Sequence, residues 1–261
     1  MIVPLLRYRS FIWHRAVNDL RHRYAGTGMG VVWNVVHPLA VIGVYALVFS
    51  TIMSARVPGV GGRFAYVLYL CAGFLPWLAF SEAVTRGAGA FVDNAAYLKK
   101  LPIPEQLFVA SSAVSATLSL MISFTLLIGI ALVAGQRPTW HWALLPLPLV
   151  SLQVMGLGLG LLLGTINVFL RDVGQLLAIA LQVVFWTVPI VYTIDLLPAW
   201  AHGPLAWHPL VPPIEAVRDL FLHARLPPAT TWAALVGWPA VALAAASLAF
   251  NRLRAEIRDV I

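Results

Sequence analysis

The chain has 261 residues, of which 61% are hydrophobic and 10% are charged, and its formal net charge is +7. A soluble domain of this length lacks the surface needed to keep so much apolar material away from water, so the composition favours a membrane protein. The positive charge is then expected to anchor the chain to anionic membrane lipid, and no basic domain indicates a nucleic-acid partner.

Residues 4–24 form the first predicted element, an amphipathic helix. Apolar residues recur along one helical face, while arginines and histidines fill its flanks. The residues of this face are Leu6, Trp13, Val17, Leu20 and Tyr24. A helix of this kind lies in the membrane interface. It is either a simple anchor or an interface helix that also contacts a cytoplasmic partner.

Six apolar stretches follow, each close to the roughly 20 residues that a helix needs to cross the hydrocarbon core. They cover residues 32–54, 64–85, 107–134, 143–166, 174–193 and 233–251. Strands of outer-membrane barrels alternate over about 10 residues, which these stretches do not. The sequence therefore predicts an all-α polytopic membrane protein with six transmembrane helices and one domain, residues 1–261. Its expected parts are a cytoplasmic interface helix (1–31), five spans (32–193), an external region (194–232) and the last span with a cytoplasmic tail (233–261).

Arginine and lysine are unevenly divided between the two sides that six spans would create. Most of them lie in the N-terminal segment, the second and fourth connections and the C-terminus. The side richer in these residues is normally cytoplasmic, so both termini are predicted to face the cytoplasm. The second connection, 86–106, is long enough to hold a short helix over residues 91–101 that lies across the membrane face.

The external stretch 194–232 is too apolar for a free loop and too rich in proline for a span. A re-entrant helical hairpin fits, because interrupted backbone is tolerated at membrane depth where protein or water surrounds it. An ordinary structured external loop is the alternative. Glu215 and Arg218 lie three residues apart and could pair on one helical face.

The chain lacks the signature of an ATP site. A phosphate-binding loop ends in Gly-Lys-Ser or Gly-Lys-Thr, and the two lysines, Lys99 and Lys100, do not follow a glycine. Gly160 and Gly164 lie in an apolar stretch and are better explained by close helix packing than by a dinucleotide loop. No histidine, cysteine or carboxylate pattern marks a metal site, so no cofactor is predicted in this chain.

Ionisable residues are scarce inside the apolar stretches. Glu82, with Arg86 one turn later, is interpreted as a structural pair near the inner end of the second span. Transporters coupled to protons or sodium usually carry several such charges. The sequence therefore argues against ion coupling and for energy supplied by another polypeptide.

Aromatic residues form stripes on three predicted spans, and Phe185, Pro189 and Tyr192 are expected to share one face of the fifth. Flat aromatic faces stack on sugar rings without fixing one hydrogen-bond pattern, so a pore lined in this way would let a glycan slide. Aromatic residues also mark headgroup belts and pack helices. The candidate lining residues are Trp33, Tyr45, Tyr66, Tyr69, Trp77, Phe80, Phe185, Trp186 and Tyr192.

Six motifs, each weak alone, occur in a specific order. They are the segment from Asn18 to Trp33, Gly73-Phe-Leu-Pro-Trp77, the segment from Asn94 to Pro104, Asn167-Val-Phe-Leu-Arg-Asp-Val173, Phe185-Trp-Thr-Val-Pro-Ile-Val-Tyr192, and His208-Pro-Leu through Arg218. With them the chain resembles, nearly end to end, the ABC-2 type permease subunits that export lipid-linked polysaccharide: O-antigen, capsule and teichoic-acid exporters. Asn18 and Ile103 depart from this pattern, which more often has arginine and an aromatic residue there.

The resemblance implies a homodimer in a bacterial inner membrane, joined to two copies of a separate ATPase that binds ATP and Mg²⁺. The cargo would be an undecaprenyl-linked polysaccharide, most simply O-antigen, and the chain itself would not be an enzyme. The residues implied in coupling to the ATPase are Asp19, Tyr24, Asn94, Tyr97, Lys99, Lys100, Arg171 and Asp172. Those implied in a periplasmic gate are Pro209, Glu215 and Arg218.

Arg21 and Arg23 are candidates to receive the pyrophosphate of the lipid carrier by charge pairing. Two other functions remain open on the sequence. One is an ABC-2 exporter of small drugs or lipids, and the other is a membrane-embedded enzyme or scaffold of glycolipid assembly.

Overall fold

The computed structural model describes residues 2–23, 25–48, 64–100, 103–194 and 197–260. Among these residues only helices, turns and irregular segments occur, so the predicted all-α class is confirmed. The helices are α1 (Ile2–Arg7), α2 (Arg9–His22), η1 (Gly30–Val32), α3 (Trp33–Tyr45), α4 (Ala65–Asp93), α5 (Ala95–Lys100), α6 (Gln106–Val133), η3 (Trp140–Leu144), α7 (Pro146–Asn167), α8 (Val173–Thr187), α9 (Ala199–Ala206), α10 (Val211–Phe221) and α11 (Ala229–Val260).

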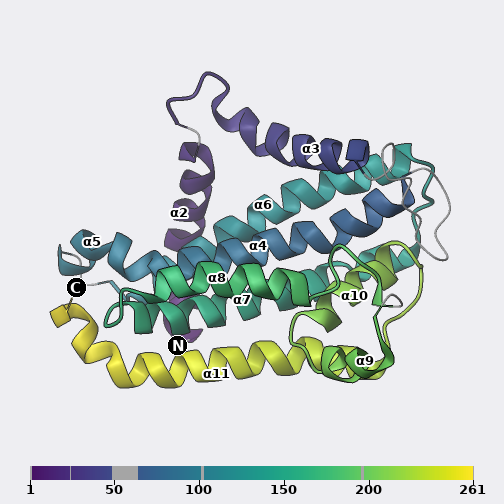
Figure 1. The fold of residues 1–261 in the computed structure, drawn as a ribbon. Helices are drawn as coiled ribbons and strands as arrows, with labels where there is room; N and C mark the ends of the chain where they lie inside the picture. The colour runs from purple at the N-terminus through teal and green to yellow at the C-terminus, as the bar shows by residue number, and fades with distance from the viewer. Residues whose placement is uncertain (1, 24, 49–63, 101–102, 195–196, 261) are drawn as a thin grey trace.

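Five helical segments are long and apolar enough to cross a membrane. They are Gly30–Val48, Ala65–Asp93, Gln106–Val133, Trp140–Asn167 and Ala229–Ile257. Figure 1 shows the corresponding helices running along a common axis, with α4 and α7 near the centre of the bundle. Residues 49–54, which belong to the first predicted span, lie outside the described residues.

The fifth predicted span, residues 174–193, forms a shorter helix. Helix α8 is apolar but only 15 residues long, and it ends at Thr187. Pro189 explains this end, since proline disfavours helical backbone at the residue before it and has no N–H to donate. The prediction of one helical face running from Phe185 to Tyr192 is therefore wrong, and a count of six spans is not confirmed.

Glycines allow α4, α7 and α11 to pack closely. A β-carbon on Gly87 of α4 would lie 2.7 Å from the Cα of Gly160 on α7, and one on Gly164 would lie 2.6 Å from the Gly87 carbonyl oxygen. On another face of α7, a β-carbon on Gly158 would lie 2.9 Å from the backbone of Ala242 on α11. The predicted packing role of Gly160 and Gly164 is confirmed. In lipid the hydrophobic effect does not drive helices together, so they associate through the close packing that small residues permit.

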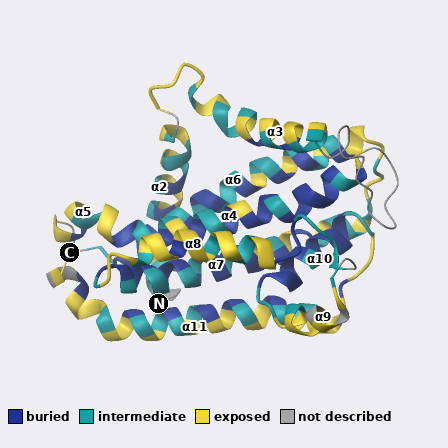
Figure 2. Cartoon of the chain, viewed as in Figure 1, coloured by how far each residue is buried: buried dark blue, intermediate teal, exposed yellow. Residues whose placement is uncertain are grey.

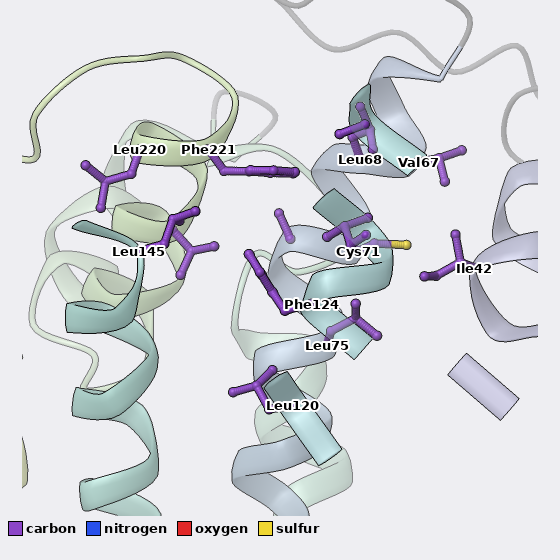
Figure 3. Close-up of a cluster of buried hydrophobic side chains, with 14 of the residues drawn as sticks. Ile42, Val67, Leu68, Cys71, Leu75, Leu120, Phe124, Leu145, Leu220 and Phe221 are labelled. Carbon is purple, nitrogen blue, oxygen red and sulfur yellow. The ribbon is translucent and has the colours of Figure 1, made fainter. Parts of the chain in front are cut away.

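A buried cluster joins the bundle to the short helix α10. Ile42 of α3, Cys71 of α4, Phe124 of α6 and Phe221 of α10 belong to it (Figure 3). Figure 2 shows α10 buried along its length, whereas much of α9, the preceding helix, is exposed. Both helices lie at one end of the bundle, and α5 and the C-terminus lie at the other (Figure 1).

Helix α2 crosses the bundle rather than running along it (Figure 1). It packs on α6 through Ile12 and Ala16, which are buried. Leu6 and Trp13, two residues of the predicted apolar face, point away from the protein and are 62% and 53% exposed. Val17 and Leu20 of the same face are half-buried, and Tyr24 lies outside the described residues, so the interface helix stays a prediction.

Candidate functional site

Charged side chains from two helices gather where α2 meets α4 and α6. Asp19 and Arg23 come from the end of α2, one helical turn apart, and Glu82 and Arg86 lie one turn apart on α4. Arg86 donates to Glu82 over 3.1 Å, so the pair predicted from their spacing is confirmed. Ser115 of α6 donates to the Asp19 carboxylate.

Two further ion pairs join the Asp19–Arg23 pair and the Glu82–Arg86 pair into one network. Arg86 Nη2 lies 2.7 Å from Asp19 Oδ1, and Arg23 pairs with Glu82. Two guanidinium groups and two carboxylates therefore alternate, and the formal charges of these four residues cancel. Each side chain keeps between 24% and 33% of its surface exposed, so the network is partly hydrated rather than sealed in the core.

The carboxyl group of Asp19 is held in its charged form. Burial alone would raise the pKa of Asp19, but hydrogen bonds from Arg86 and Ser115, with the charges of Arg86 and Arg23, bring it below its ordinary value. Opposite charges and donated hydrogen bonds both favour a carboxylate over the neutral acid. Asp19 thus ties α2 to the bundle as an anion.

A cavity of about 650 Å³ opens above this network, between α3, α4, α6 and α8. Its lining changes character along α4. Arg86 and Glu82 lie at one end, while Trp77 and Phe74 lie at the other with Phe185 of α8. Trp77 and Arg86 are nine positions apart on α4, which corresponds to about 14 Å along the helix. The cavity therefore offers a charged region and an aromatic region at a separation that an amphiphilic ligand can bridge.

Aromatic rings in contact form the apolar wall. The centroid of Phe74 lies 5.1 Å from that of Tyr45 and 6.0 Å from that of Phe185, and Trp77 lies 5.9 Å from both Phe185 and Phe80. Phe74 was missed by the sequence prediction, although it is three residues before Trp77 and therefore shares its side of the helix. Ring pairs at these separations favour a fixed arrangement of the wall.

The predicted lining residues do not form one continuous surface in a single copy of the chain. Phe185 and Trp77 border the cavity, although Trp77 is only 5% exposed, whereas Phe80 and Tyr45 do not border it. Tyr45 packs against Phe74. Trp186 is 61% exposed on the outer face of α8. Trp33 is partly buried at the start of α3 and does not border the cavity.

The other three predicted lining residues fasten the segment that follows α8. Tyr66 donates to the carbonyl of Val191, and Tyr69 donates to that of Tyr192 over 3.2 Å. The Tyr192 hydroxyl donates a hydrogen bond to the Trp186 carbonyl at the end of α8, over 3.0 Å. Their hydroxyls thus fix irregular backbone in place.

Arg218 of α10 is fully buried and holds the same segment. Its Nη1 donates to the Pro189 carbonyl and to Glu215, each over 2.6 Å, and its Nη2 donates to the Ile190 carbonyl over 2.8 Å. The predicted pairing of Glu215 with Arg218 is confirmed. The guanidinium also lies 3.7 Å from the centre of the Tyr69 ring. Pro209, another predicted gate residue, lies in the turn between α9 and α10.

Glycine at position 73 makes room for Arg218. A β-carbon there would lie 2.8 Å from Arg218 Nη2 and 3.3 Å from a methyl group of Ile214. The glycine of the Gly73-to-Trp77 motif therefore lets α10 approach α4.

The two segments predicted to couple to an ATPase contact each other through Arg15. This α2 residue donates to the Asn94 side chain at the start of α5, and its guanidinium lies 4.5 Å from the centre of the Phe108 ring on α6. Tyr97 is nearby, with its ring 5.9 Å from the Arg15 guanidinium. Arg15 was missed because its partners are about 80 residues away along the chain.

The remaining residues predicted to couple to the ATPase or to bind the headgroup differ in exposure. Five of them are exposed and do not belong to the ion-pair network: Lys99, Lys100, Arg171, Asp172 and Arg21. Tyr24 lies outside the described residues. Asp19 and Arg23 belong to the ion-pair network. Of the two arginines predicted to bind the headgroup, Arg23 borders the cavity and Arg21 does not.

These features define a multi-pass helical membrane protein whose charged and aromatic groups gather in one cavity. Within the part of the chain that the structure describes, no group of three or more histidine, cysteine, aspartate or glutamate residues could hold a metal ion. The chain belongs to the ABC-2 type transporter family, which it matches over residues 12–222.

Three relatives illustrate this membership. The chain is 28% identical over 263 residues to the O-antigen export system permease protein RfbA of Myxococcus xanthus, covering 100% of this chain and 99% of the relative. It is 26% identical to the protein of the same name from Klebsiella pneumoniae, over 80% of this chain and 78% of the relative. It is 22% identical to the polysialic acid transport protein KpsM of Escherichia coli, over 78% of each.

Proposed function

We propose that this chain is the membrane subunit of an ATP-driven exporter that moves lipid-linked polysaccharide, with O-antigen as the first candidate cargo. The names of its relatives support this, since two are O-antigen export permeases and one transports polysialic acid. The observation that carries the proposal is the cavity with a charged end and an aromatic end. A lipid pyrophosphate suits the first, and sugar rings suit the second.

In this proposal the ion-pair network is the entry point for the carrier headgroup. Arg23 and Arg86 both border the cavity and are now paired with carboxylates. Guanidinium groups bind phosphate and carboxylate with the same planar donor geometry, so a pyrophosphate could take the place of Glu82 at Arg23. Trp77 and Phe185 would then stack on the first sugars.

The energy would come from two copies of a separate ATPase that binds ATP and Mg²⁺, pressing on the cytoplasmic end of the bundle. Helix α5 presents Tyr97, Lys99 and Lys100 there, and Arg15 joins it to α2. A push on α5 would therefore move α2 and the floor of the cavity together. Both termini would be cytoplasmic, and the membrane would be a bacterial inner membrane.

The working unit would be a homodimer whose shared channel is lined partly by α8. This helix buries only Leu177, and its opposite face exposes a run of large apolar side chains. They are Leu176, Ile179, Val183 and Trp186. Together with the segment after it, α8 would serve as the sixth span, and α9 with α10 would form a re-entrant gate.

Copurification with the ATPase encoded beside this gene tests the proposal. The complex would be placed in nanodiscs, and ATP turnover would be measured with and without lipid-linked glycan. A stable complex that the glycan stimulates supports the proposal. Stimulation by small drugs or lipids alone would favour the other kind of ABC-2 exporter, and failure to form a complex would favour an enzyme or scaffold of glycolipid assembly.

A further inference from the structure

A second cavity, separate from the first, lies between the α9–α10 hairpin and the last span. Its volume is about 800 Å³. Trp207, Pro212 and Glu215 line it from the hairpin side, and Gly237 and Trp238 line it from α11. We refer to it as the hairpin groove. None of its lining residues borders the cavity above the ion-pair network.

The α11 side of the hairpin groove is suited to a hydrocarbon chain. It is formed by small or apolar side chains, and Val241 at its edge is 59% exposed on a predicted membrane-spanning helix. A β-carbon on Gly237 would meet no atom within 4 Å, so the space over the helix is open. In a bilayer, lipid covers such a surface.

The hairpin side carries one charge. Among the described residues that line the groove, Glu215 is the only ionisable one. Its partner Arg218 has no exposed surface, whereas the Glu215 side chain keeps 26% of its surface exposed. The pair is neutral as a whole, yet it presents its carboxylate toward the groove and keeps its guanidinium in the core.

Two tryptophans line the same groove as this carboxylate. Trp207 is 79% exposed at the rim, and Trp238 lines the wall on α11. Indole faces attract organic ammonium groups, and tryptophan is the strongest of the aromatic residues in this respect. Tryptophan is also enriched at headgroup depth in membranes. A groove lined by one carboxylate and two indoles therefore complements a cationic headgroup and opposes a purely anionic one.

We propose that the hairpin groove binds a zwitterionic phospholipid with an ammonium headgroup, such as phosphatidylethanolamine. Its ammonium group would lie against Glu215 and the indole of Trp207. One acyl chain would lie on the small residues of α11. The site requires only that the chain spans a membrane, and it does not depend on the cargo or on the ATPase.

The test compares lipids with the same acyl chains and different headgroups. The full-length chain in detergent would be titrated with phosphatidylethanolamine or phosphatidylglycerol, and the thermal unfolding midpoint would be followed. We expect the apparent affinity for phosphatidylethanolamine to be roughly fivefold higher, in line with the upper end of the range for an exposed cation–π contact. Equal or tighter binding of phosphatidylglycerol would overturn the proposal. Equal binding of a polyprenyl phosphate would also overturn it, because the groove would then select only the tail.

Two tryptophans on the same hairpin provide a matched pair of variants. Trp200 and Trp207 are 78% and 79% exposed, but only Trp207 lines the groove. Trp207→Ala should remove the headgroup preference, and Trp200→Ala should keep it. If both variants keep the preference, the proposed site is wrong.

A third variant blocks the groove without disturbing the buried pair of Glu215 and Arg218. Gly237→Leu places a large side chain into the open space over α11. It should fold normally and lose stabilisation by phosphatidylethanolamine. Unchanged lipid stabilisation in this folded variant would contradict the proposal, even if Glu215→Gln fails to fold.

Discussion

Arg86 of α4 and Asp19 of α2 lie 67 residues apart in sequence, and their side chains meet over 2.7 Å. This contact fixes a helix that crosses the bundle onto helices that run along it. Arg86 also borders the cavity between α3, α4, α6 and α8, and Asp19 holds it there from α2.

Arg86→Ala should loosen α2 from the bundle. The variant removes the donor that Asp19 and Glu82 share, and hydrogen bonds to charged groups contribute about 1.5–3 kcal/mol each. We expect a loss of about 2 kcal/mol in unfolding free energy and faster amide hydrogen exchange in α2. Arg21→Ala, an exposed arginine on the same helix, is the control and should change neither. Equal behaviour of the two variants would contradict the role given to Arg86.

Acid should release α2 through Asp19. The folded-state pKa of Asp19 lies below its ordinary value, so its contribution is complete above about pH 4 and is lost as the pH falls through the lowered folded value. The protection of α2 amides, taken relative to their intrinsic exchange rate at each pH, should therefore fall below pH 4. Asp19→Asn should already show fast exchange at neutral pH and little change on acidification. A wild-type profile that is flat below pH 4 would count against this account.

Gly164→Ala should separate α7 from α4. The added β-carbon would lie 2.6 Å from the Gly87 carbonyl oxygen, which belongs to rigid helical backbone. Overpacking of this kind costs about 1–3 kcal/mol. Gly129→Ala on α6, where a β-carbon meets nothing within 4 Å, is the matched control. The midpoint temperature of thermal unfolding in detergent should fall clearly for Gly164→Ala and stay unchanged for Gly129→Ala.

Arg218→Lys should release the segment after α8 even though it keeps the charge. Lysine cannot donate to two backbone carbonyls and to Glu215 with the planar geometry of arginine. Breaking a buried ion pair typically costs about 3–5 kcal/mol. Because lysine keeps the charge and Glu215 is partly exposed, the loss should lie in the lower part of that range. The thermal unfolding midpoint provides the measurement. A wild-type midpoint would show that the carbonyl contacts contribute little.

Local spacing predicted the contacts that lie within one helix or one stripe. Glu82 with Arg86, Glu215 with Arg218, and the packing of Gly160 and Gly164 followed from residues three or four apart. The all-α class followed from composition. Hydropathy overestimated the length of the fifth helix, because it counts apolar residues and gives no weight to the break that Pro189 introduces.

Contacts between distant segments could not be predicted in this way. Nothing in the local pattern showed that Arg23 would meet Glu82, or that Arg15 would hold Asn94. Tyr69, Trp77 and Phe80 were all predicted to line a channel, but helical spacing could not tell whether each side chain faces a cavity or packs in the core. In the structure both Trp77 and Phe80 are buried, and only Trp77 borders the cavity.

The most direct test of the central claim is transport itself. The chain and its ATPase would be reconstituted in sealed vesicles loaded with lipid-linked polysaccharide, and a lectin would report glycan that reaches the opposite leaflet. We expect glycan to become accessible only when ATP is added, and Phe185→Ala in the cavity wall to reduce the rate at least severalfold, as expected for a lost stacking surface. Glycan that stays protected in the presence of ATP, while a small lipid or drug crosses in the same vesicles, would contradict the proposed function.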